Sequence, residues 1–199
     1  MTKSDVLTKV LHSKIDNLSD FLEKFSSSEI YIAEYSANGT SYILKNADWN
    51  TKTGAIEVRR GRGKTPELVT FSKDKIFTIY NSSEIGFIPT DGRGLLKSRC
   101  CDFVFFNDTN FCLVELKLNA TSTNDLTIRN NRVKAIEQLK STLRYFDKIL
   151  SKDYSGLELE AFVATPDTYP QRDTAFQSLS VSFLEATGVK LFESREKRY

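Results

Sequence analysis

Apolar side chains recur every three or four residues near the start of the chain. Between residues 5 and 25 they occupy Val6, Val10, Leu11, Ile15, Leu18, Phe21, Leu22 and Phe25. This 3.6-residue period predicts an amphipathic helix over residues 5–25, and Ser4 is available to cap its first turn.

The following residues alternate short apolar runs with turn residues, which is typical of strands. Residues 30–35 and 41–45 flank Ala37, Asn38 and Gly39, and the Asn-Gly step favours the positive φ values of a hairpin turn. We therefore expect two antiparallel strands here, and a further strand over residues 75–80.

Glycine and proline interrupt the two neighbouring segments. Residues 55–72 contain Gly61, Gly63 and Pro66 around a basic run, so they predict a strand, a loop and a second strand. Residues 84–97 contain Pro89, Gly92 and Gly94, and they predict a connecting loop.

The second half of the chain alternates apolar runs with helical patterns. Residues 132–150 predict a helix because their apolar side chains are three or four positions apart, at Ile136, Leu139, Leu143, Phe146 and Leu150. Residues 157–165 predict a buried strand, residues 171–187 a helix that Gly188 ends, and residues 189–193 a last strand.

This order of elements predicts an α/β fold with a mixed central sheet flanked by helices. The 199 residues show no repeat and no clear boundary, so we expect a single domain over residues 1–199. Residues 30–80 are predicted to be rich in β-hairpins, and the alternative to a continuous domain is that they form an insertion in it.

The composition is that of an ordinary globular protein, with 40% hydrophobic residues and a formal net charge of +2. Bulk charge therefore does not mark a protein that coats nucleic acid. Three cysteines and a single histidine exclude the usual His-bearing zinc sites within this chain and favour a reducing compartment. Because no signal peptide or stretch of ~20 apolar residues is evident, we expect a cytoplasmic protein with no membrane partner.

One pair of predicted strands carries a charged constellation. Residues 101–106 and 111–117 are strongly apolar and are joined by the polar residues 107–110. If Phe106 pairs with Phe111, then Asp102 lies opposite Glu115 on the same face of the sheet. Lys117 shares that face, because side chains along a strand repeat with a period of two.

Two carboxylates at neighbouring positions of a buried sheet repel each other unless a cation joins them or a proton neutralises them. Mg²⁺ binds carboxylate oxygens at about 2.1 Å, keeps several waters and also binds phosphate oxygens. Asp102 and Glu115 therefore predict a site for Mg²⁺ or Mn²⁺. The competing interpretation is an exposed Glu-Lys pair on an edge strand, because the Glu-x-Lys spacing alone occurs by chance.

Asp102 followed by Glu115-Leu116-Lys117 on the next strand, between two helices, resembles the PD-(D/E)XK nuclease superfamily. The resemblance covers about residues 102–165 and implies a restriction-endonuclease-like core. It implies that Asp102 and Glu115 bind one or two Mg²⁺ ions and that Lys117 orients or deprotonates the attacking water. It further implies an additional acid from the first helix, for which Glu23 is best placed, ahead of Asp20 and Asp16.

Two positions depart from the pattern of that superfamily. Cys101 precedes Asp102 in place of proline. Gln138 is the kind of amide that RecB-like members bring to the site in a supporting role, but Thr142 follows where those members have tyrosine.

Basic residues supply candidate contacts to a polyanion. Arg59, Arg60, Arg62 and Lys64 lie in the glycine-rich segment, where the alternative is a solvated turn. Arg99, with Arg93 and Lys97, leads into Asp102, while Arg129, Arg132 and Lys134 begin the second predicted helix. We expect the second and third groups to lie near the metal.

Together these observations predict a metal-dependent nuclease that hydrolyses phosphodiester bonds, with DNA favoured over RNA as the substrate. The alternatives are an inactive module of the same fold that binds nucleic acid or protein, and an RNA-directed nuclease. A homodimer that cuts both strands is an arrangement known for small nucleases of this kind.

Overall fold

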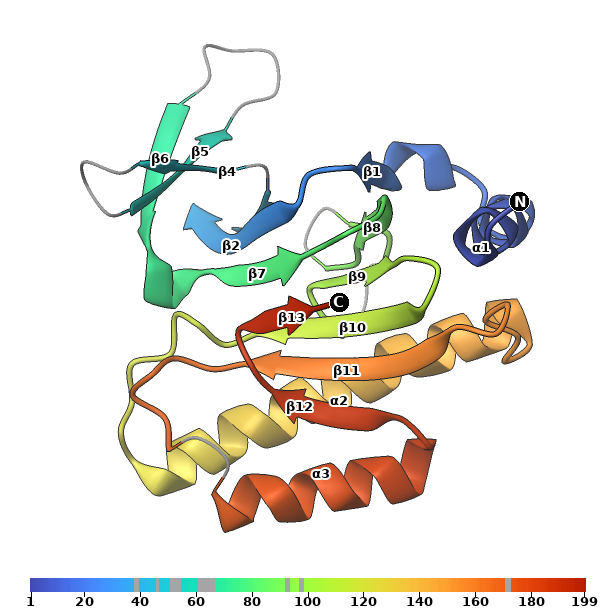
Figure 1. Cartoon of the computed structure of the whole chain (residues 1–199). Coiled ribbons are helices and arrows are strands. Elements are labelled where there is room, and N and C mark those ends of the chain that lie inside the picture. Colours follow the sequence, from blue (N-terminus) through green and yellow to red (C-terminus); the bar gives the residue numbers. More distant parts are fainter. Residues whose placement is uncertain are drawn as a thin grey trace.

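A mixed six-stranded sheet forms the centre of the molecule (Figure 1). The computed structural model describes residues 1–37, 40–45, 47–50, 55–60, 67–91, 94–96, 99–170 and 173–199, with the backbone alone at residues 36–37, 40–42, 47–50, 55–60 and 67–68. The strand order is β1 (Glu23–Phe25), β8 (Ile85–Pro89), β9 (Phe103–Phe106), β10 (Asn110–Leu116), β11 (Glu158–Ala164) and β12 (Lys190–Glu193). In this sheet β1, β8, β9 and β10 pair antiparallel with their neighbours, and β10, β11 and β12 pair parallel.

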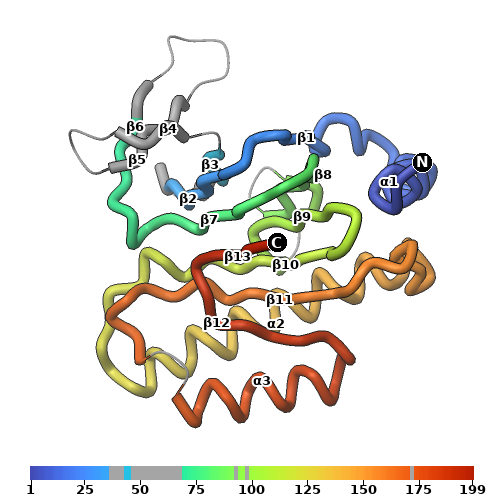
Figure 2. The backbone as a smooth tube through the Cα atoms, viewed as in Figure 1, coloured from blue at the N-terminus to red at the C-terminus, as the bar shows by residue number. Residues whose placement is uncertain are grey.

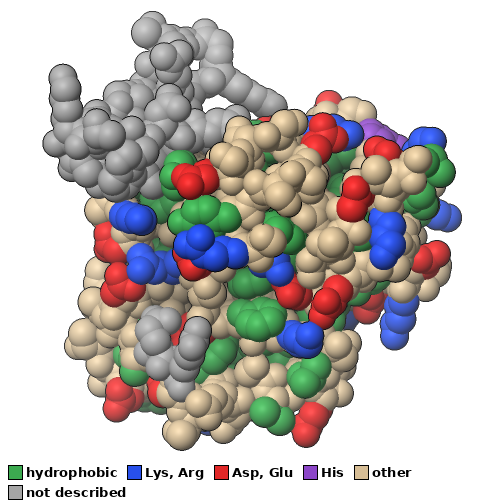
Figure 3. Space-filling model, in the orientation of Figure 1, with side chains coloured by type: hydrophobic (Ala, Val, Ile, Leu, Met, Phe, Trp, Pro, Cys, Tyr) green, Lys and Arg blue, Asp and Glu red, His purple; other side chains and the backbone are tan. Residues whose placement is uncertain are grey.

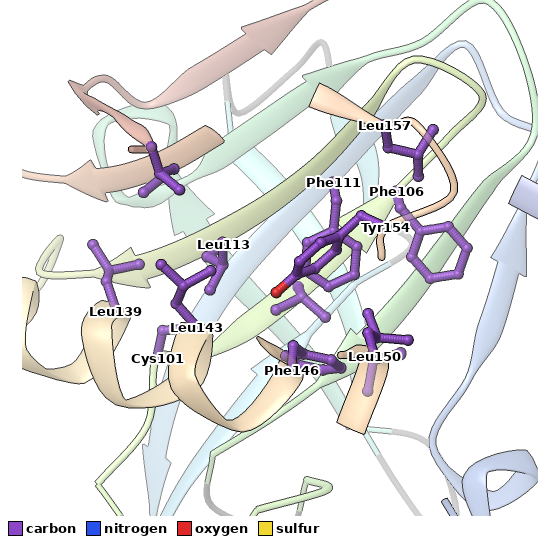
Figure 4. Close-up of a cluster of buried hydrophobic side chains, with 14 of the residues drawn as sticks. Cys101, Phe106, Phe111, Leu113, Leu139, Leu143, Phe146, Leu150, Tyr154 and Leu157 are labelled. Atoms are coloured by element: carbon purple, nitrogen blue, oxygen red, sulfur yellow. The ribbon is translucent and has the colours of Figure 1, made fainter. Parts of the chain in front are cut away.

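Helices cover one face of this sheet: α1 (Lys3–Lys14), α2 (Asp125–Leu150) and α3 (Thr174–Thr187). The predicted apolar stripe of α2 is buried, and Figure 4 shows Leu139, Leu143 and Phe146 directed toward Phe111 and Leu113 of β10. Burying each such side chain stabilises the fold by roughly 1.5–3 kcal/mol. The structure thus confirms an α/β fold with a mixed central sheet flanked by helices.

A second sheet covers the opposite face, with strand order β13 (Glu196–Arg198), β7 (Phe77–Tyr80), β2 (Glu29–Ala37) and β3 (Thr40–Leu44). Ile30, Ile32 and Phe77 pack in one cluster with Phe103 and Val114 of the central sheet. The chain ends near the middle of the molecule, where β13 lies beside β7 (Figure 2). Part of the elaboration over residues 30–80 therefore belongs to the core.

The predicted hairpins in this half of the chain are confirmed. β2 and β3 pair antiparallel around residues 38–39, which lie outside the described residues. A third sheet contains β4 (Ala47–Asn50), β5 (Ala55–Arg60) and β6 (Glu67–Ser72), so residues 55–72 do form two paired strands.

The predicted first helix is too long. α1 ends at Lys14, because Ile15 is extended and Asn17 has a φ of 43°, in the left-handed region. A short 3-10 helix, η1 (Leu18–Asp20), follows, and residues 23–25 form β1. The apolar period continues past Lys14 because Ile15 and Leu18 pack into the same core although neither belongs to α1.

The predicted loop over residues 84–97 is also wrong, because β8 occupies its first part. Gly86 pairs with Phe106, and a Cβ at Gly86 would lie 2.4 Å from Cζ of that ring. Glycine here permits a close approach of the strand to an aromatic ring. Pro89 lies at the end of the strand.

Two further boundaries differ. α2 begins at Asp125, seven residues before the predicted start, and Asn124 caps it by accepting a hydrogen bond from the Thr127 N–H. A second 3-10 helix, η2 (Lys73–Lys75), precedes β7. Within the described ranges, none of the helices has both the length and the apolar character needed to cross a membrane.

Candidate functional site

The pairing of β9 with β10 has the register expected from the sequence. Phe106 pairs with Phe111, and the ladder continues to Phe103, which pairs with Val114. Because side chains alternate along a strand, Glu115 lies on the face of β10 that carries Phe111 and Leu113, toward the helices.

The ladder stops one residue before the expected pair of Asp102 and Glu115. The Asp102 N–H donates to the Val114 carbonyl oxygen at 3.0 Å, and the Asp102 Oδ2 accepts from the Leu116 N–H at 2.6 Å. Asp102 is therefore fixed by its side chain to the backbone of β10, beyond the last paired residue.

Glu115 is held at the carboxyl end of β10, where it pairs with Val163 of β11. It is 1% exposed, and its Oε1 accepts a hydrogen bond from the Lys117 ammonium. Its Oε2 is buried and has no hydrogen-bond partner among the described residues. A buried carboxylate oxygen without a partner is costly, and each such oxygen in a protein calls for an explanation.

Helix α2 connects the site to the segment that leads into Asp102. The Gln138 Oε1 accepts from the Lys117 Nζ at 3.2 Å, and the Gln138 Nε2 donates to the Cys100 carbonyl oxygen at 2.9 Å. One turn further on, the Thr142 hydroxyl accepts from the Cys101 N–H at 2.8 Å. Gln138 thus holds the Lys117 side chain, and Thr142 fastens the same helix to the segment before Asp102.

The two acids, the lysine and the Gln138 amide share a cavity of about 430 Å³. Two carboxylates that the sequence interpretation missed also line it, Glu34 of β2 and Asp91, which follows β8. Glu34 is on the face of β2 that buries Ile30 and Ile32, so an acid at an inward-facing strand position was the available signal.

Asp91 was missed because residues 84–97 were assigned to a loop. Its N–H donates to the Asp102 carbonyl oxygen at 3.3 Å, and Gly94 closes a turn by donating to the Asp91 carbonyl oxygen. Recognition of β8 would have placed an acid just beyond a strand end beside Asp102.

Burial is the main electrostatic influence on the two acids. It raises the pKa of Asp102 to about 7, against the lowering effect of the Leu116 N–H, and the Glu34 charge raises it further. Burial and the charge of Asp102 raise the pKa of Glu115 well above its usual range. Burial alone would lower the pKa of Lys117, but Glu115 and Asp102 outweigh it and the net pKa is raised. The site therefore has more buried carboxylate than the half-buried Lys117 ammonium neutralises.

The residues present fit a hard divalent cation. No group of three or more His, Cys, Asp or Glu side chains close enough to hold a metal is found in the described part of the chain. Mg²⁺ needs only one or two carboxylates because it keeps several waters. Asp102 and Glu115 supply that number, and the unpartnered Glu115 Oε2 is an oxygen that a cation would satisfy.

Glu23 is not brought to this cavity. It lies in β1 instead of a helix, it is exposed, and it forms an ion pair with Lys45 at 2.5 Å. The expectation that the first helix contributes an acid is wrong for this residue, because the helix ends before it is reached.

Most of the predicted substrate contacts lie outside the described residues. Arg59 and Arg60 end β5, but their side chains, and Arg62 and Lys64 altogether, lie outside the described residues. Arg99 is exposed and is not among the described residues that line the cavity. On the face seen in Figure 3, the described basic and acidic side chains are interspersed instead of forming a patch of one sign.

Arg132 and Lys134 were expected near the metal with similar roles, but their environments differ. Arg132 is 2% exposed and binds Glu193, Asp173 and the Pro170 carbonyl oxygen, so its role is structural and its predicted phosphate contact is wrong. Lys134 is exposed and lines the cavity.

Comparison of the chain with protein-family models, curated proteins and solved structures finds no match. Asp102, Glu115 and Lys117 remain the residues on which the resemblance to PD-(D/E)XK nucleases depends. A functional assignment for this chain therefore depends on the geometry around these three residues.

Proposed function

We propose that the protein is a metal-dependent nuclease that hydrolyses phosphodiester bonds, most readily those of DNA. The observation that carries the proposal is the buried, unpartnered Oε2 of Glu115, in a cavity shared with Asp102 and Lys117. The order of helix, strands and helix around these residues agrees with the order that the resemblance to PD-(D/E)XK nucleases implies.

Each side chain has a distinct task in this proposal. Asp102 and Glu115 would hold Mg²⁺ or Mn²⁺, which when bound polarises the phosphodiester and lowers the pKa of its bound water. Lys117 is a hydrogen-bond donor with a raised pKa, so it suits orientation of the attacking water or stabilisation of charge on a phosphate oxygen. Gln138 keeps the Lys117 ammonium beside Glu115.

Cleavage assays with matched lysine variants test this function. The substrates are supercoiled plasmid, single-stranded DNA and a structured RNA, each with Mg²⁺, Mn²⁺ or EDTA. We expect metal-dependent cutting that Lys117→Ala reduces by about 10²–10⁴-fold, the range lost with a positioned proton-transfer group. Lys140→Ala is the control. Lys140 is on the same helix as Gln138, has nearly the same exposed fraction as Lys117, and is not among the described residues that line the cavity.

A metal titration tests the ligands independently of cleavage. Calorimetry with Mn²⁺ should detect binding by the native chain and a loss of more than about 10-fold in affinity for Glu115→Gln, because even outer-shell partners change affinity 10–100-fold. Glu137→Gln, at an exposed position of α2, should bind Mn²⁺ as the native chain does.

The outcomes separate the alternatives. Cutting of RNA alone would assign the site to an RNA-directed nuclease. Metal binding without cutting of any substrate would favour an inactive binding module. Cutting that continues in EDTA, or that Lys117→Ala leaves unchanged, would refute the proposed mechanism.

A further inference from the structure

The walls of the cavity differ in charge. The strand and loop segments contribute four carboxylates and one ammonium, from Glu34, Asp91, Asp102, Glu115 and Lys117. Helix α2 contributes Asn131, Lys134 and Gln138, which include no acid. Residues three or four positions apart lie on one side of a helix, so these three side chains form a polar ridge without an acid. A phosphate chain that approaches the cavity meets least repulsion along this ridge.

Lys134 is the cation of this ridge. It is exposed, and it forms no ion pair or hydrogen bond with any residue that the structure describes. Two cations close to it are already paired, Lys117 with Glu115 and Arg132 with Glu193. Arg129, on the same helix, is exposed and is not among the described residues that line the cavity. The charge of Lys134 is therefore available to a ligand, at the solvent side of the same cavity.

The position of Lys134 along the helix suits a nucleic-acid strand. It precedes Gln138 by one turn, a rise of about 6 Å along the helix axis. Gln138 contacts Lys117, so the helix places Lys134 roughly one turn away from the reacting group. Charges along one strand of a duplex recur about every 3.4 Å of its axis, so this offset corresponds to one or two nucleotides.

Asn131 limits how this ridge can move. Its Nδ2 donates to the Tyr169 hydroxyl at 2.7 Å, and Tyr169 is 1% exposed. The ridge is thus attached to the segment after β11, and a ligand would find it already ordered.

We infer that Lys134 binds a backbone phosphate that flanks the scissile one, in a nucleic-acid strand lying along the ridge Asn131, Lys134 and Gln138. This inference rests on the proposed nuclease function and names the part of the protein that positions the substrate. A contact to a phosphate carries no sequence information, so its contribution is independent of base sequence.

Lys148 provides a matched control for Lys134. It is an exposed lysine of the same helix, and it too has no ion pair or hydrogen bond with a described residue. It lies 14 residues later, close to four helical turns, so it faces nearly the same direction about 21 Å further along the axis. Lys148 does not line the cavity.

Binding is measured by fluorescence anisotropy with a labelled 20-nucleotide single strand and with the corresponding duplex, in Mg²⁺. Every chain carries Lys117→Ala so that the probe stays intact. Adding Lys134→Ala should weaken binding about 3–10-fold on unrelated sequences, and it should reduce the slope of log Kd against log salt by about 0.7 for the single strand or about 0.9 for the duplex. Adding Lys148→Ala should change neither quantity.

Kinetics of the chain with native Lys117 give a second readout. Lys134→Ala should raise KM by a similar factor and leave kcat within about twofold, because a flanking contact is made equally in the ground and transition states. Lys134→Arg should retain most of the native KM. Equal melting temperatures for the Lys134 and Lys148 variants would exclude a folding effect.

The results distinguish failure of this inference from failure of the proposed function. If the parent chain binds and cuts but Lys134→Ala behaves like Lys148→Ala, or lowers kcat with KM and salt slope unchanged, the inference is overturned and the nuclease stands. If the parent chain neither binds nor cuts any DNA or RNA, both are overturned.

Discussion

Two buried charged clusters lie at the carboxyl edge of the parallel strands, and they are built in opposite ways. In the arginine cluster, Arg132 donates to both oxygens of Glu193 at 2.8 and 2.9 Å, to Asp173 at 2.8 Å and to the Pro170 carbonyl oxygen at 2.7 Å. In the acidic cluster, Asp102 and Glu115 share one lysine, and an oxygen of Glu115 has no partner among the described residues.

The pKa shifts agree with this difference. Burial tends to raise the pKa of Asp173, but the hydrogen bond and charge of Arg132 outweigh it and the net pKa is lowered. For Asp102 and Glu115 burial wins, and both pKa values are raised. The arginine cluster has matched donors and acceptors, whereas the acidic cluster has more carboxylate than its lysine neutralises, which is the property on which the proposed metal site depends.

The largest expected effect is in the arginine cluster. Arg132→Leu should lower the free energy of unfolding by about 3–5 kcal/mol, because it leaves Glu193 buried and unpaired. Urea unfolding measures this change, with Arg144→Leu at an exposed position of α2 as the control. A loss below about 1 kcal/mol would mean that the arginine cluster is not a structural element.

In the acidic cluster a neutral side chain should stabilise the metal-free protein. The pKa of Asp102 is about 7 in the folded protein, above the unfolded value near 4. Ionisation of Asp102 therefore lowers the stability of the fold. This loss is zero below pH 4, grows between pH 4 and pH 7, and is complete above pH 7. Asp102→Asn removes that charge and still accepts from the Leu116 N–H. In EDTA at pH 8 we expect a gain of about 2–4 kcal/mol over the native chain, which vanishes near pH 4.

Magnesium should close most of the stability difference between the two chains. The native protein at pH 8 should gain about 2.7 kcal/mol at a Mg²⁺ concentration 100 times its Kd, and Asp102→Asn should gain much less. Urea unfolding at pH 4 and pH 8, with EDTA or Mg²⁺, gives all the required values. A native chain that Mg²⁺ does not stabilise would remove the contrast between the clusters.

The smallest expected effect concerns an outer member of the arginine cluster. The Thr165 hydroxyl donates to the Glu193 Oε1 at 3.2 Å, and the side chain is buried. Thr165→Val should lower the free energy of unfolding by about 1 kcal/mol, since one hydrogen bond is lost while Arg132 still neutralises Glu193. Ser178→Ala, at an exposed position of α3, serves as the control in the same urea series.

The parts of the site that could be predicted from the sequence are those fixed by local rules. The polar connector at residues 107–110 led to the pairing of Phe106 with Phe111, which gave the register of β9 and β10 and with it the approach of Asp102 to Glu115 and Lys117. The resemblance to RecB-like nucleases also pointed to the Gln138 amide, and the structure places it beside Lys117 because α2 packs directly on β10.

The remaining acids could not be predicted because they depend on packing between distant segments. Glu34 reaches the cavity because β2 packs on the face of the central sheet opposite the helices. Asp91 reaches it because β8, which contains Gly86, pairs with β9 beside Phe106. Glu23 was assigned from an apolar period that also fits a helix followed by a turn and a strand. Arg132 was indistinguishable from Lys134 in sequence, since only the fold places Glu193 beside it.

Asp102 stands where the pairing of β9 with β10 stops, and its carboxylate receives a hydrogen bond from the main chain of β10. The direction of this carboxylate is thus set by the backbone of the two strands, while Gln138 and Thr142 hold the segment that precedes it. Aspartate has the reach for that bond, while glutamate would overshoot it by one methylene. The chemistry of such a site can survive extensive sequence drift, provided that the two strands keep their alignment and the few charged positions are retained.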